Sequence, residues 1–353
     1  MDKFLYDIWL TSCVMGNPSY VNVALEQYKD AKSVYENRQK LPQKISEKLE
    51  VFSLNDAKDV IKQCEENNIE IIDRESEFYP EYLLNSDIAP HILYVLGNKE
   101  LLKRPLVSIT GSRRANFDGK ENARKFSQSL SLVGLGIVTG FADGIEEEVI
   151  RSVKEAITVL PSGILNPYPK AHSRLIKDVV KNGGLVVSPF MPKLSAYKWN
   201  FRFRNRILAA ISQSTLIIQA CEGSATNMTF GFCADYSRTC YAIPGPINDK
   251  YYTSTNEYLK MGASLVTNPV DIISDYGIAL QTENIQQETK EYNFNENQQK
   301  IVNVLRDSDL SCDAICMKTG LDTGTVLTEI LMLELEDVVV RLDDDKIKLI
   351  IKE

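Results

Sequence analysis

Histidine is scarce in this chain: its 353 residues include only His91 and His172. Histidine is the side chain most often used for acid–base catalysis near neutral pH and for binding metals. The seven cysteines form no Cys-x-x-Cys pair, and Cys312 and Cys316, one helical turn apart, have no histidine beside them. We therefore expect no metal site, no other cofactor, no disulfide framework and no enzymatic activity. Reduced thiols are typical of the cytoplasm.

Long apolar stretches are also missing. No segment approaches the roughly 20 consecutive apolar residues that cross a bilayer. The first thirteen residues carry Asp2 and Asp7 and lack the basic start and apolar core of a secretory signal. We therefore expect a cytoplasmic protein with no membrane partner. Hydrophobic residues make up 44% and charged residues 25% of the chain, as in ordinary globular proteins, and the length suits two or three domains.

Acidic residues are absent from one long window. Between Val179 and Cys221 there is no Asp or Glu, although the whole chain has a formal net charge of −8. The window contains the cations Lys181, Lys193, Lys198, Arg202, Arg204 and Arg206 and the aromatic residues Tyr197, Trp199, Phe201 and Phe203. Cations for phosphates and rings for bases are the components of a single-stranded nucleic-acid groove. A solvated amphipathic segment without a ligand would explain the same charges.

The hydrophobic pattern divides the chain into four parts. Residues 1–75 have apolar positions at helical spacing, which predicts a helical N-terminal domain. Residues 76–276 alternate short apolar runs with amphipathic segments, which predicts an α/β, Rossmann-like, doubly wound and mostly parallel sheet. Residues 277–292 are polar and predict a linker. Residues 293–353 give helices followed by two short strands, as in a winged helix. The predicted core strands are 106–110, 136–140, 156–160, 185–189, 215–220 and 240–245.

The loops after these strands carry the residues suited to a ligand. Ligands of doubly wound sheets bind at the carboxyl ends of the strands. Strand 106–110 runs into Gly111–Arg114, which offers a tight turn, a hydroxyl group and two guanidinium groups that can bind phosphate. Strand 215–220 is followed by Ser224 and Thr226, whose hydroxyls suit phosphate oxygens and helix caps equally. The GxGxxG dinucleotide motif and the Walker A loop are both missing.

Several motifs occur together in a fixed order along the chain. They are Phe78-Tyr79-Pro80, Leu93-Tyr94 with Gly97, Gly111-Ser112-Arg113, Gly140 to Glu146, Val159 to Gly163 with Tyr168-Pro169, Phe201 to Ile207, and Pro244-Gly245. In this order and near this spacing they resemble the DNA processing protein A family, also called DprA or Smf, over almost the whole chain. Each motif is weak alone, and the ordered set is specific.

The resemblance implies a Rossmann-like protein that binds single-stranded DNA, protects incoming DNA in natural transformation and helps to load a RecA-type recombinase. It also implies a homodimer formed through the core domain. Combined with the loop analysis, the candidate DNA contacts are Gly111, Ser112, Arg113, Arg114, Lys198, Phe201, Arg202, Arg204, Asn205, Arg206, Ser224 and Thr226. For Arg204 and Arg206, pairing with carboxylates to hold the loop is an equally open role. The hypothesis requires the acid-free window and the arginine turn to meet in space.

The chain also departs from the family pattern. Asp143 stands where the family has arginine, which exchanges a cation for an anion beside the expected groove, and Arg202 replaces the family's proline. We therefore expect a divergent member whose binding mode is either weakened or changed, with Arg202 as a partial compensation. Whether Asp143 weakens DNA binding stays open on the sequence. Residues 293–353 carry seven cations and thirteen acids, and the helix expected near 323–335 has no Lys or Arg. A helix that reads duplex DNA is normally basic, so we expect this one not to bind DNA.

Two other functions remain open on the sequence. A nucleotide-binding or nucleotide-hydrolysing protein with the related lonely-guy fold is one. The segment from Gly223 to Thr229 lacks the double glycine and the catalytic glutamate of that family, which counts against hydrolysis. A scaffold that has kept the fold and lost DNA binding is the other, and Asp143 is its best support.

Overall fold

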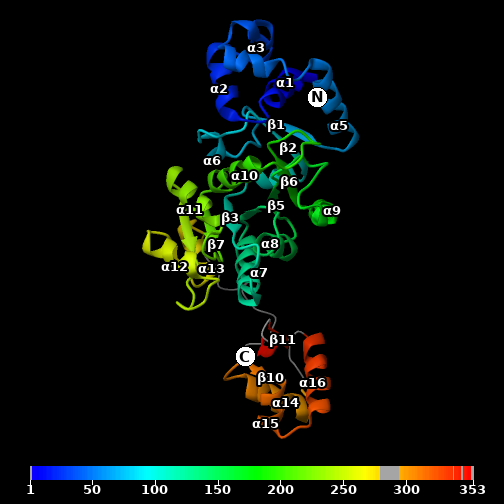
Figure 1. The fold of residues 1–353 in the computed structure, drawn as a ribbon, viewed down its shortest axis with the longest axis vertical. Coiled ribbons are helices and arrows are strands. Elements are labelled where there is room, and N and C mark those ends of the chain that lie inside the picture. The colour runs from blue at the N-terminus through cyan, green and yellow to red at the C-terminus, as the bar shows by residue number, and fades with distance from the viewer. Residues whose placement is uncertain (1, 279–293, 337, 343–344, 351–353) are drawn as a thin grey trace. The chain divides into compact units, whose positions relative to one another are not determined.

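The chain forms two compact units, Met1–Ile278 and Ala279–Glu353. A computed structural model describes residues 2–278, 294–336, 338–342 and 345–350 (Figure 1). The predicted linker, 277–292, lies outside the described residues except for its first two positions. The predicted division between 1–75 and 76–276 falls inside the first unit and stays a prediction.

Short helices open the first unit (Figure 1, blue). They are α1 (Leu5–Cys13), α2 (Pro18–Gln27), α3 (Ala31–Asn37), α4 (Gln43–Leu49) and α5 (Leu54–Glu66). Local capping explains where they begin: the Asn17 side chain accepts from the Ser19 amide, and Ser53 forms a capping box with Asp56. The buried indole of Trp9 donates to the Phe52 carbonyl at 2.8 Å, which ties α1 to the start of α5. The predicted helical N-terminal region is confirmed.

Within residues 2–278 the strands form one nine-stranded sheet, in the order β1-β2-β6-β5-β4-β3-β7-β8-β9. The strands are β1 (Glu70–Asp73), β2 (Ile92–Gly97), β3 (Leu106–Thr110), β4 (Gly136–Thr139), β5 (Ile157–Val159), β6 (Leu185–Ser188), β7 (Ser214–Ile217), β8 (Thr239–Ala242) and β9 (Ser264–Leu265). Strands β3 to β9 pair in parallel, and β1 and β2 add an antiparallel edge. The predicted mostly parallel, doubly wound sheet is confirmed.

The chain reverses direction across the sheet at β3. It steps outward from β3 through β4 and β5 to β6 and then returns to β7, on the other side of β3. The helices that connect the parallel strands are α7 (Phe117–Leu132), α8 (Ile145–Ser152), α9 (Ser173–Lys181), α10 (Lys198–Ala210), α11 (Thr226–Asp235) and α12 (Thr253–Lys260). The reversal makes the carboxyl ends of β3 and β7 the topological switch point, where such sheets bind ligands.

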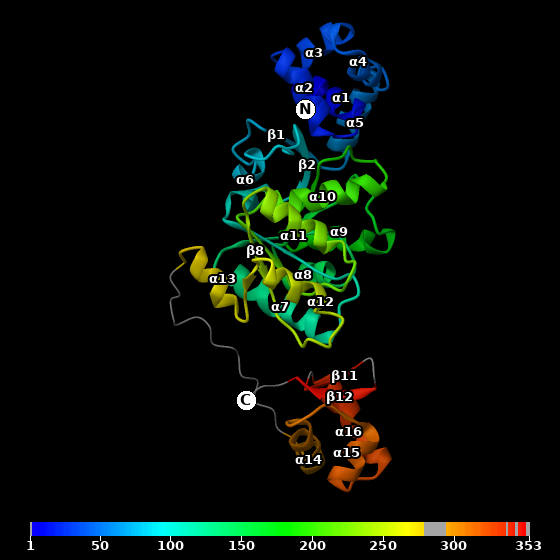
Figure 2. The same cartoon turned by 60° about the vertical axis from the view of Figure 1, so that its left-hand side comes forward.

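The two faces of the sheet bury alternate residues of the same strands. In β6, Val186 packs in the cluster that contains Leu175 of α9 and the N-terminal helices, whereas Val187 packs in the cluster that contains Ile207 of α10. The N-terminal helices therefore share a core with one face of the sheet, and α10 covers the other. Helices α10 and α11 lie side by side on that second face (Figure 2).

The second unit has its own core. Its elements are α14 (Glu296–Leu305), β10 (Leu310–Ser311), α15 (Cys312–Thr319), α16 (Thr323–Leu335), β11 (Val339–Arg341) and β12 (Lys346–Leu349). In the described part of this unit the strands form a three-stranded antiparallel sheet in the order β10-β12-β11. Ile301, Ile330 and Ile347 are fully buried between the helices and the sheet. Three helices with a small β-wing agree with the predicted winged helix.

Candidate nucleic-acid interface

The loops after β3 and β7 are joined by their backbones. The Ser112 amide donates to the Gln219 carbonyl at 2.8 Å, and the Ile145 amide, at the start of α8, donates to the Ser112 carbonyl at 3.2 Å. Gly144 has φ +80°, and a Cβ there would overlap the carbonyl oxygens of Ser112 and Arg113. Glycine at this position therefore lets the loop after β4 pack directly on the arginine turn.

A buried glutamine fixes the start of α7 beside these loops. Gln219 Nε2 donates to the Asn116 side chain at 2.7 Å, and Asn116 in turn caps α7 by accepting from the Gly119 amide at 2.9 Å. The sequence analysis did not single out Gln219 or Asn116. The signal available in the sequence was only an asparagine ahead of an amphipathic segment, which is a typical N-cap.

The hydrophobic pattern predicts a helix over 204–211, whereas helix α10 begins at Lys198. Trp199 and Phe203, four residues apart, both pack against the buried ring of Phe190, with ring centroids at 5.6 and 6.0 Å, although Trp199 keeps 36% of its surface exposed. These ring contacts hold the first turns of the helix in place. The opposite side of these turns exposes Lys198 and Arg202, with Phe201 half-buried between them. A cationic, aromatic stripe therefore runs along the outer face of α10.

The arginine turn meets this stripe. The guanidinium group of Arg113 lies 5.5 Å from the centroid of the Phe201 ring, and Tyr168 packs edge-on against the same ring at 5.4 Å. Arg113 comes from the carboxyl end of β3, whereas Phe201 belongs to the acid-free window. The two segments that the sequence required to come together are thus in direct contact.

Four cationic side chains at this surface are available to bind phosphates. Arg113, Arg114, Lys198 and Arg202 are exposed, and none of them makes an ion pair with any residue that the structure describes. Such side chains can neutralise phosphates without first breaking an internal contact. The Arg202 guanidinium also lies 6.0 Å from the ring centroid of Phe232 on α11, which extends the stripe towards that helix.

Arg206 is partly engaged. Its guanidinium donates to the Asp87 carboxylate at 3.2 Å and to the Tyr236 hydroxyl at 2.7 Å. Burial raises the pKa of Tyr236 to about 12, against the opposing effect of Arg206, so this hydroxyl stays neutral as an acceptor. Because Asp87 is well exposed, the ion pair is open to solvent and competes only weakly with a phosphate.

Arg204 is at the centre of a buried ion pair. Its side chain is 3% exposed, and Nη1 donates to Glu146 Oε1 at 2.7 Å. Glu146 also accepts from the Thr110 hydroxyl at 2.8 Å and from the Ala142 amide at 2.9 Å. A Cβ at Gly140 would overlap this pair. Of the two roles left open for Arg204, its geometry is that of a carboxylate partner that joins α10 to the ends of β3 and β4.

The small residues among the candidate DNA contacts mostly face the interior of the protein. Ser112 and Asn205 are buried, and the Ser112 hydroxyl accepts from the Arg114 amide at 3.1 Å. The Ser224 hydroxyl accepts from the Thr226 hydroxyl at 2.9 Å, at the start of α11. The N-cap of α11 is Ala225, without a side-chain capping hydrogen bond, so both roles of Ser224 and Thr226 stay predictions. Gly111 packs against Ile145, and a Cβ atom at position 111 would overlap the Ile145 side chain.

The carboxylate of Asp143 lies close to a histidine side chain. Its carboxylate lies 3.1 Å from Nε2 of His172, and Glu147 Oε2 lies 3.5 Å from the same nitrogen. The sequence analysis considered Asp143 only as an anion in place of the family's arginine. The structure instead groups three ligand-type side chains beside the arginine turn.

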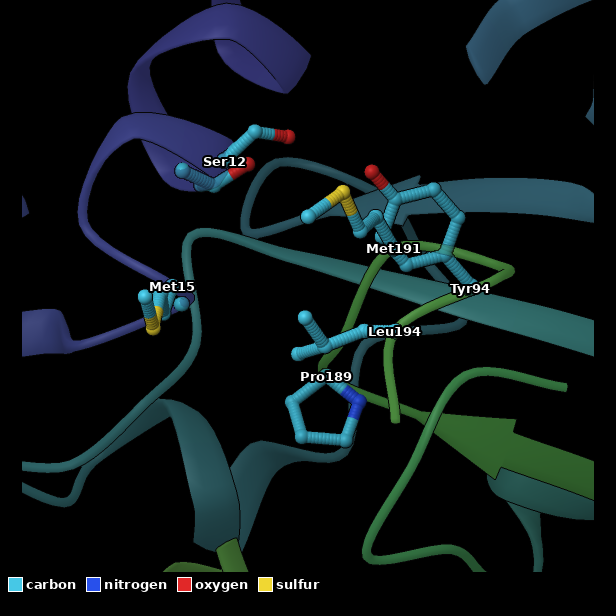
Figure 3. A pocket seen from close by; sticks show the side chains of 8 residues that line it. Ser12, Met15, Tyr94, Pro189, Met191 and Leu194 are labelled. Carbon is cyan, nitrogen blue, oxygen red and sulfur yellow. The ribbon is translucent and has the colours of Figure 1, made fainter. Parts of the chain in front are cut away.

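A small pocket of the first unit lies away from this surface, where the end of α1 meets β2 and the loop after β6 (Figure 3). It is lined mainly by apolar side chains such as Met15, Met191 and Leu194. Its position between the N-terminal helices and the sheet marks a packing seam. An open surface and not an enclosed cavity is what a flexible strand of nucleic acid requires.

The chain matches two family models. The model described as DNA recombination-mediator protein A matches residues 70–277, and the DprA winged helix domain matches residues 288–345. Protein Smf of Escherichia coli is 30% identical over 220 residues, which are 61% of this chain and 59% of Smf. DNA processing protein DprA of Streptococcus pneumoniae is 32% identical over 202 residues, 56% of this chain and 71% of that protein. The match to Smf thus spans less than two thirds of that protein's length.

Solved structures agree with the fold. The X-ray structure of DNA processing protein A from Streptococcus pneumoniae superimposes with a TM-score of 0.67 and 25% identity, covering 77% of this chain and 97% of that one. DNA processing protein A from Helicobacter pylori, whose single-stranded DNA binding mode has been described, gives a TM-score of 0.53 at 24% identity over 59% of this chain and 95% of that one. In the described residues, no helix combines the length and the apolar character of a membrane span.

Proposed function

This chain belongs to the DNA recombination-mediator protein A family, and from that premise we propose that it binds single-stranded DNA along the outer face of α10 and the arginine turn. The observation that carries the proposal is the contact between Arg113 and Phe201 at 5.5 Å. Arg114, Lys198 and Arg202 are also exposed and form no ion pair with the described residues. The cations bind the backbone of the strand, and the ring of Phe201 stacks on a base.

The contacts have unequal roles. Arg113, Lys198 and Arg202 neutralise phosphates, and Arg206 adds a weaker contact because Asp87 competes for it. Arg204 holds the loops in place through Glu146 and does not meet the strand. The backbone turn at Gly111 and Ser112 sets the direction of Arg113. This division follows from which guanidinium groups are exposed and which are buried against a carboxylate.

The wider role proposed for the protein is that of its relatives. We infer that it processes incoming single-stranded DNA in natural transformation, protects it and helps to load a RecA-type recombinase, as a cytoplasmic homodimer without catalytic activity. The family description as a recombination mediator and the names of the DNA processing relatives support this role. The strand-binding surface described above is the part of the proposal that this chain's own residues carry.

A salt titration tests the binding proposal. We expect oligo-dT to bind more tightly than a duplex of equal length, with log K falling against log salt at a slope of about −3, because four free cations each displace about 0.7 counterion from a single strand. Fluorescence polarisation over a range of salt concentrations measures the slope. Calorimetry with mononucleotides is the matched control. A protein that binds mononucleotides but not oligo-dT at low salt would be a nucleotide-binding protein and not a strand binder.

The second unit should contribute little to this affinity. In α16 the exposed side chains include Leu327, Leu331 and Met332, and the helix contains Glu329 but no Lys or Arg. We expect a chain that ends at Ile278 to bind oligo-dT within about threefold of the full chain, because α16 offers no cation to a phosphate. The same polarisation assay on both chains checks this. A loss of an order of magnitude on truncation would assign strand contacts to the second unit.

A further inference from the structure

Three side chains with ligand atoms meet at the edge of the proposed strand-binding surface. Asp143 lies in the loop after β4, Glu147 in the first turn of α8, and His172 in the short turn η4 (Lys170–His172) that precedes α9. One ligand atom from each lies within 4.8 Å of the other two. We propose that Asp143, Glu147 and His172 bind one divalent first-row cation, which supplies positive charge where Asp143 has replaced the family's arginine.

The distances fit a metal centre. Nε2 of His172 lies 3.1 Å from Asp143 Oδ1 and 3.5 Å from Glu147 Oε2. Two ligands at about 2.0–2.1 Å from a tetrahedral zinc ion are about 3.3 Å apart, and an octahedral ion brings neighbouring ligands to about 3.0 Å. Two of the three pairs of ligand atoms therefore already have the spacing of a coordination sphere. All three atoms lie within 4.8 Å of one another, and the Asp143 side chain is 62% exposed, which leaves it room to turn towards an ion.

The histidine is held in position by its surroundings. The side chain of His172 is 9% exposed, and its ring packs edge-on against Phe141 at 5.7 Å. Nδ1 is buried and has no hydrogen-bond partner among the described residues, so Nε2 is the nitrogen aimed at the carboxylates. Glu147 is fixed as well, because Arg151 donates to Oε1 at 2.8 Å and leaves Oε2 for the cluster. An outer contact of this kind commonly orients a metal ligand.

The charges of the cluster favour a cation. The carboxylates of Asp143 and Glu147 face the imidazole of His172, and Arg151 neutralises only the charge of Glu147. With a neutral imidazole, one negative charge remains uncompensated. A divalent cation neutralises both carboxylates with the imidazole neutral.

The site adjoins the DNA surface that we propose, and its role there rests on that proposed function. Asp143 precedes Gly144, whose backbone packs on Arg113, and His172 lies four residues after Tyr168, which contacts Phe201. Three protein ligands leave at least one coordination position open to solvent. A phosphate oxygen of the bound strand can occupy that position, so the ion would take over the phosphate contact of the missing arginine.

One nitrogen and two carboxylate oxygens suit Mn²⁺ and Zn²⁺. Mn²⁺ is the better probe because the seven free cysteines compete for zinc and have little affinity for manganese. The full-length protein is titrated with Mn²⁺ at constant ionic strength, and free Mn²⁺ is followed by electron paramagnetic resonance. We expect one tight site in the unmodified protein, weakened at least tenfold in Asp143→Asn and in His172→Gln. Glu148→Gln removes a carboxylate from the same turn of α8 outside the cluster and should keep the site.

The same variants are then compared for oligo-dT binding in Mn²⁺ and in EDTA at equal ionic strength. Mn²⁺ should raise the oligo-dT affinity of the unmodified protein at least threefold. The oligo-dT affinity of the Asp143→Asn variant should be the same in Mn²⁺ and in EDTA. Equal Mn²⁺ affinity of the unmodified protein and folded Asp143→Asn overturns the metal site, whatever the DNA result. Mn²⁺ binding that depends on Asp143, in a protein that binds no oligonucleotide with or without the ion, upholds the site and refutes the proposed strand binding instead.

Discussion

Replacing Arg113 by glutamate should lower the affinity for oligo-dT by about 100-fold at low salt. Arg113 is exposed and makes no ion pair within the described residues, so its charge is available to a phosphate. A unit charge about 4 Å from a phosphate contributes about 1 kcal/mol in water and about 4 kcal/mol at an effective dielectric of 20. Reversing its sign turns an attraction into a repulsion of similar size, and about 2.7 kcal/mol corresponds to the 100-fold loss. Polarisation assays measure the change.

The control for this variant is Lys58→Glu. Lys58 is an exposed residue of α5, on the N-terminal helices, and its replacement makes the same change in net charge away from the arginine turn. We expect it to change the affinity by less than about threefold, because distant surface charges are screened. The circular dichroism spectrum and the unfolding midpoint should be those of the unmodified protein for both variants. If both variants lost affinity equally, net charge and not the arginine turn would govern binding.

The sheet could be predicted from the sequence because its strands are buried on both faces. Runs such as 106–110 and 185–189 are continuously apolar or β-branched, and helical patterns separate them. Strands β1, β2 and β9 were not predicted. Strand β1 is a short edge strand in a polar context, and β9 has only two residues, both exposed. Strand β2 is apolar and mostly buried, and its residues Leu93 and Tyr94 were interpreted only as part of a family motif. A hydrophobic pattern reports burial, so elements that bury little leave little trace in it.

The exposed part of the candidate site was predictable for a related reason. Cations without neighbouring acids, and an aromatic residue among them, are visible in the sequence of an acidic chain, and Lys198 and Phe201 were found that way. Arg113 was found as a guanidinium group in the loop after a predicted strand and through the family resemblance. Their contact in space follows from the strand order, which places the loop after β3 at the switch point next to α10. The start of α10 was missed because Trp199 and Phe203 look like part of the exposed aromatic run, whereas they are packing residues.

Buried polar pairs were not predictable from the sequence. Acids at a helix start, such as Glu146, are typical first-turn residues that favour the helix dipole, and nothing in the neighbours of Glu146 points to Arg204, 58 residues later. Nothing in the neighbours of Asp143 points to His172, which approaches it from a separate loop. Pairwise chemistry across the fold depends on which loops share an edge of the sheet. Only the three-dimensional arrangement assigns partners to such residues.

Replacing Arg204 by alanine should destabilise the first unit by about 3–5 kcal/mol, because it leaves the carboxylate of Glu146 buried without a cation. Urea denaturation followed by circular dichroism measures the free energy of unfolding. The double variant Arg204→Met with Glu146→Leu removes both charges and should recover most of the lost stability, since apolar residues can replace a buried ion pair.

The matched control for Arg204 is Arg206→Ala, which breaks a solvent-exposed ion pair two residues away and should cost less than about 1 kcal/mol. The contrast separates two arginines that look alike in the sequence. A small loss of stability in Arg204→Ala together with a large loss of oligo-dT affinity would make Arg204 a strand contact and reverse the division of roles. A large loss of stability, with oligo-dT affinity restored in the double variant, would establish that its contribution to binding acts through Glu146 and the loops that the pair holds.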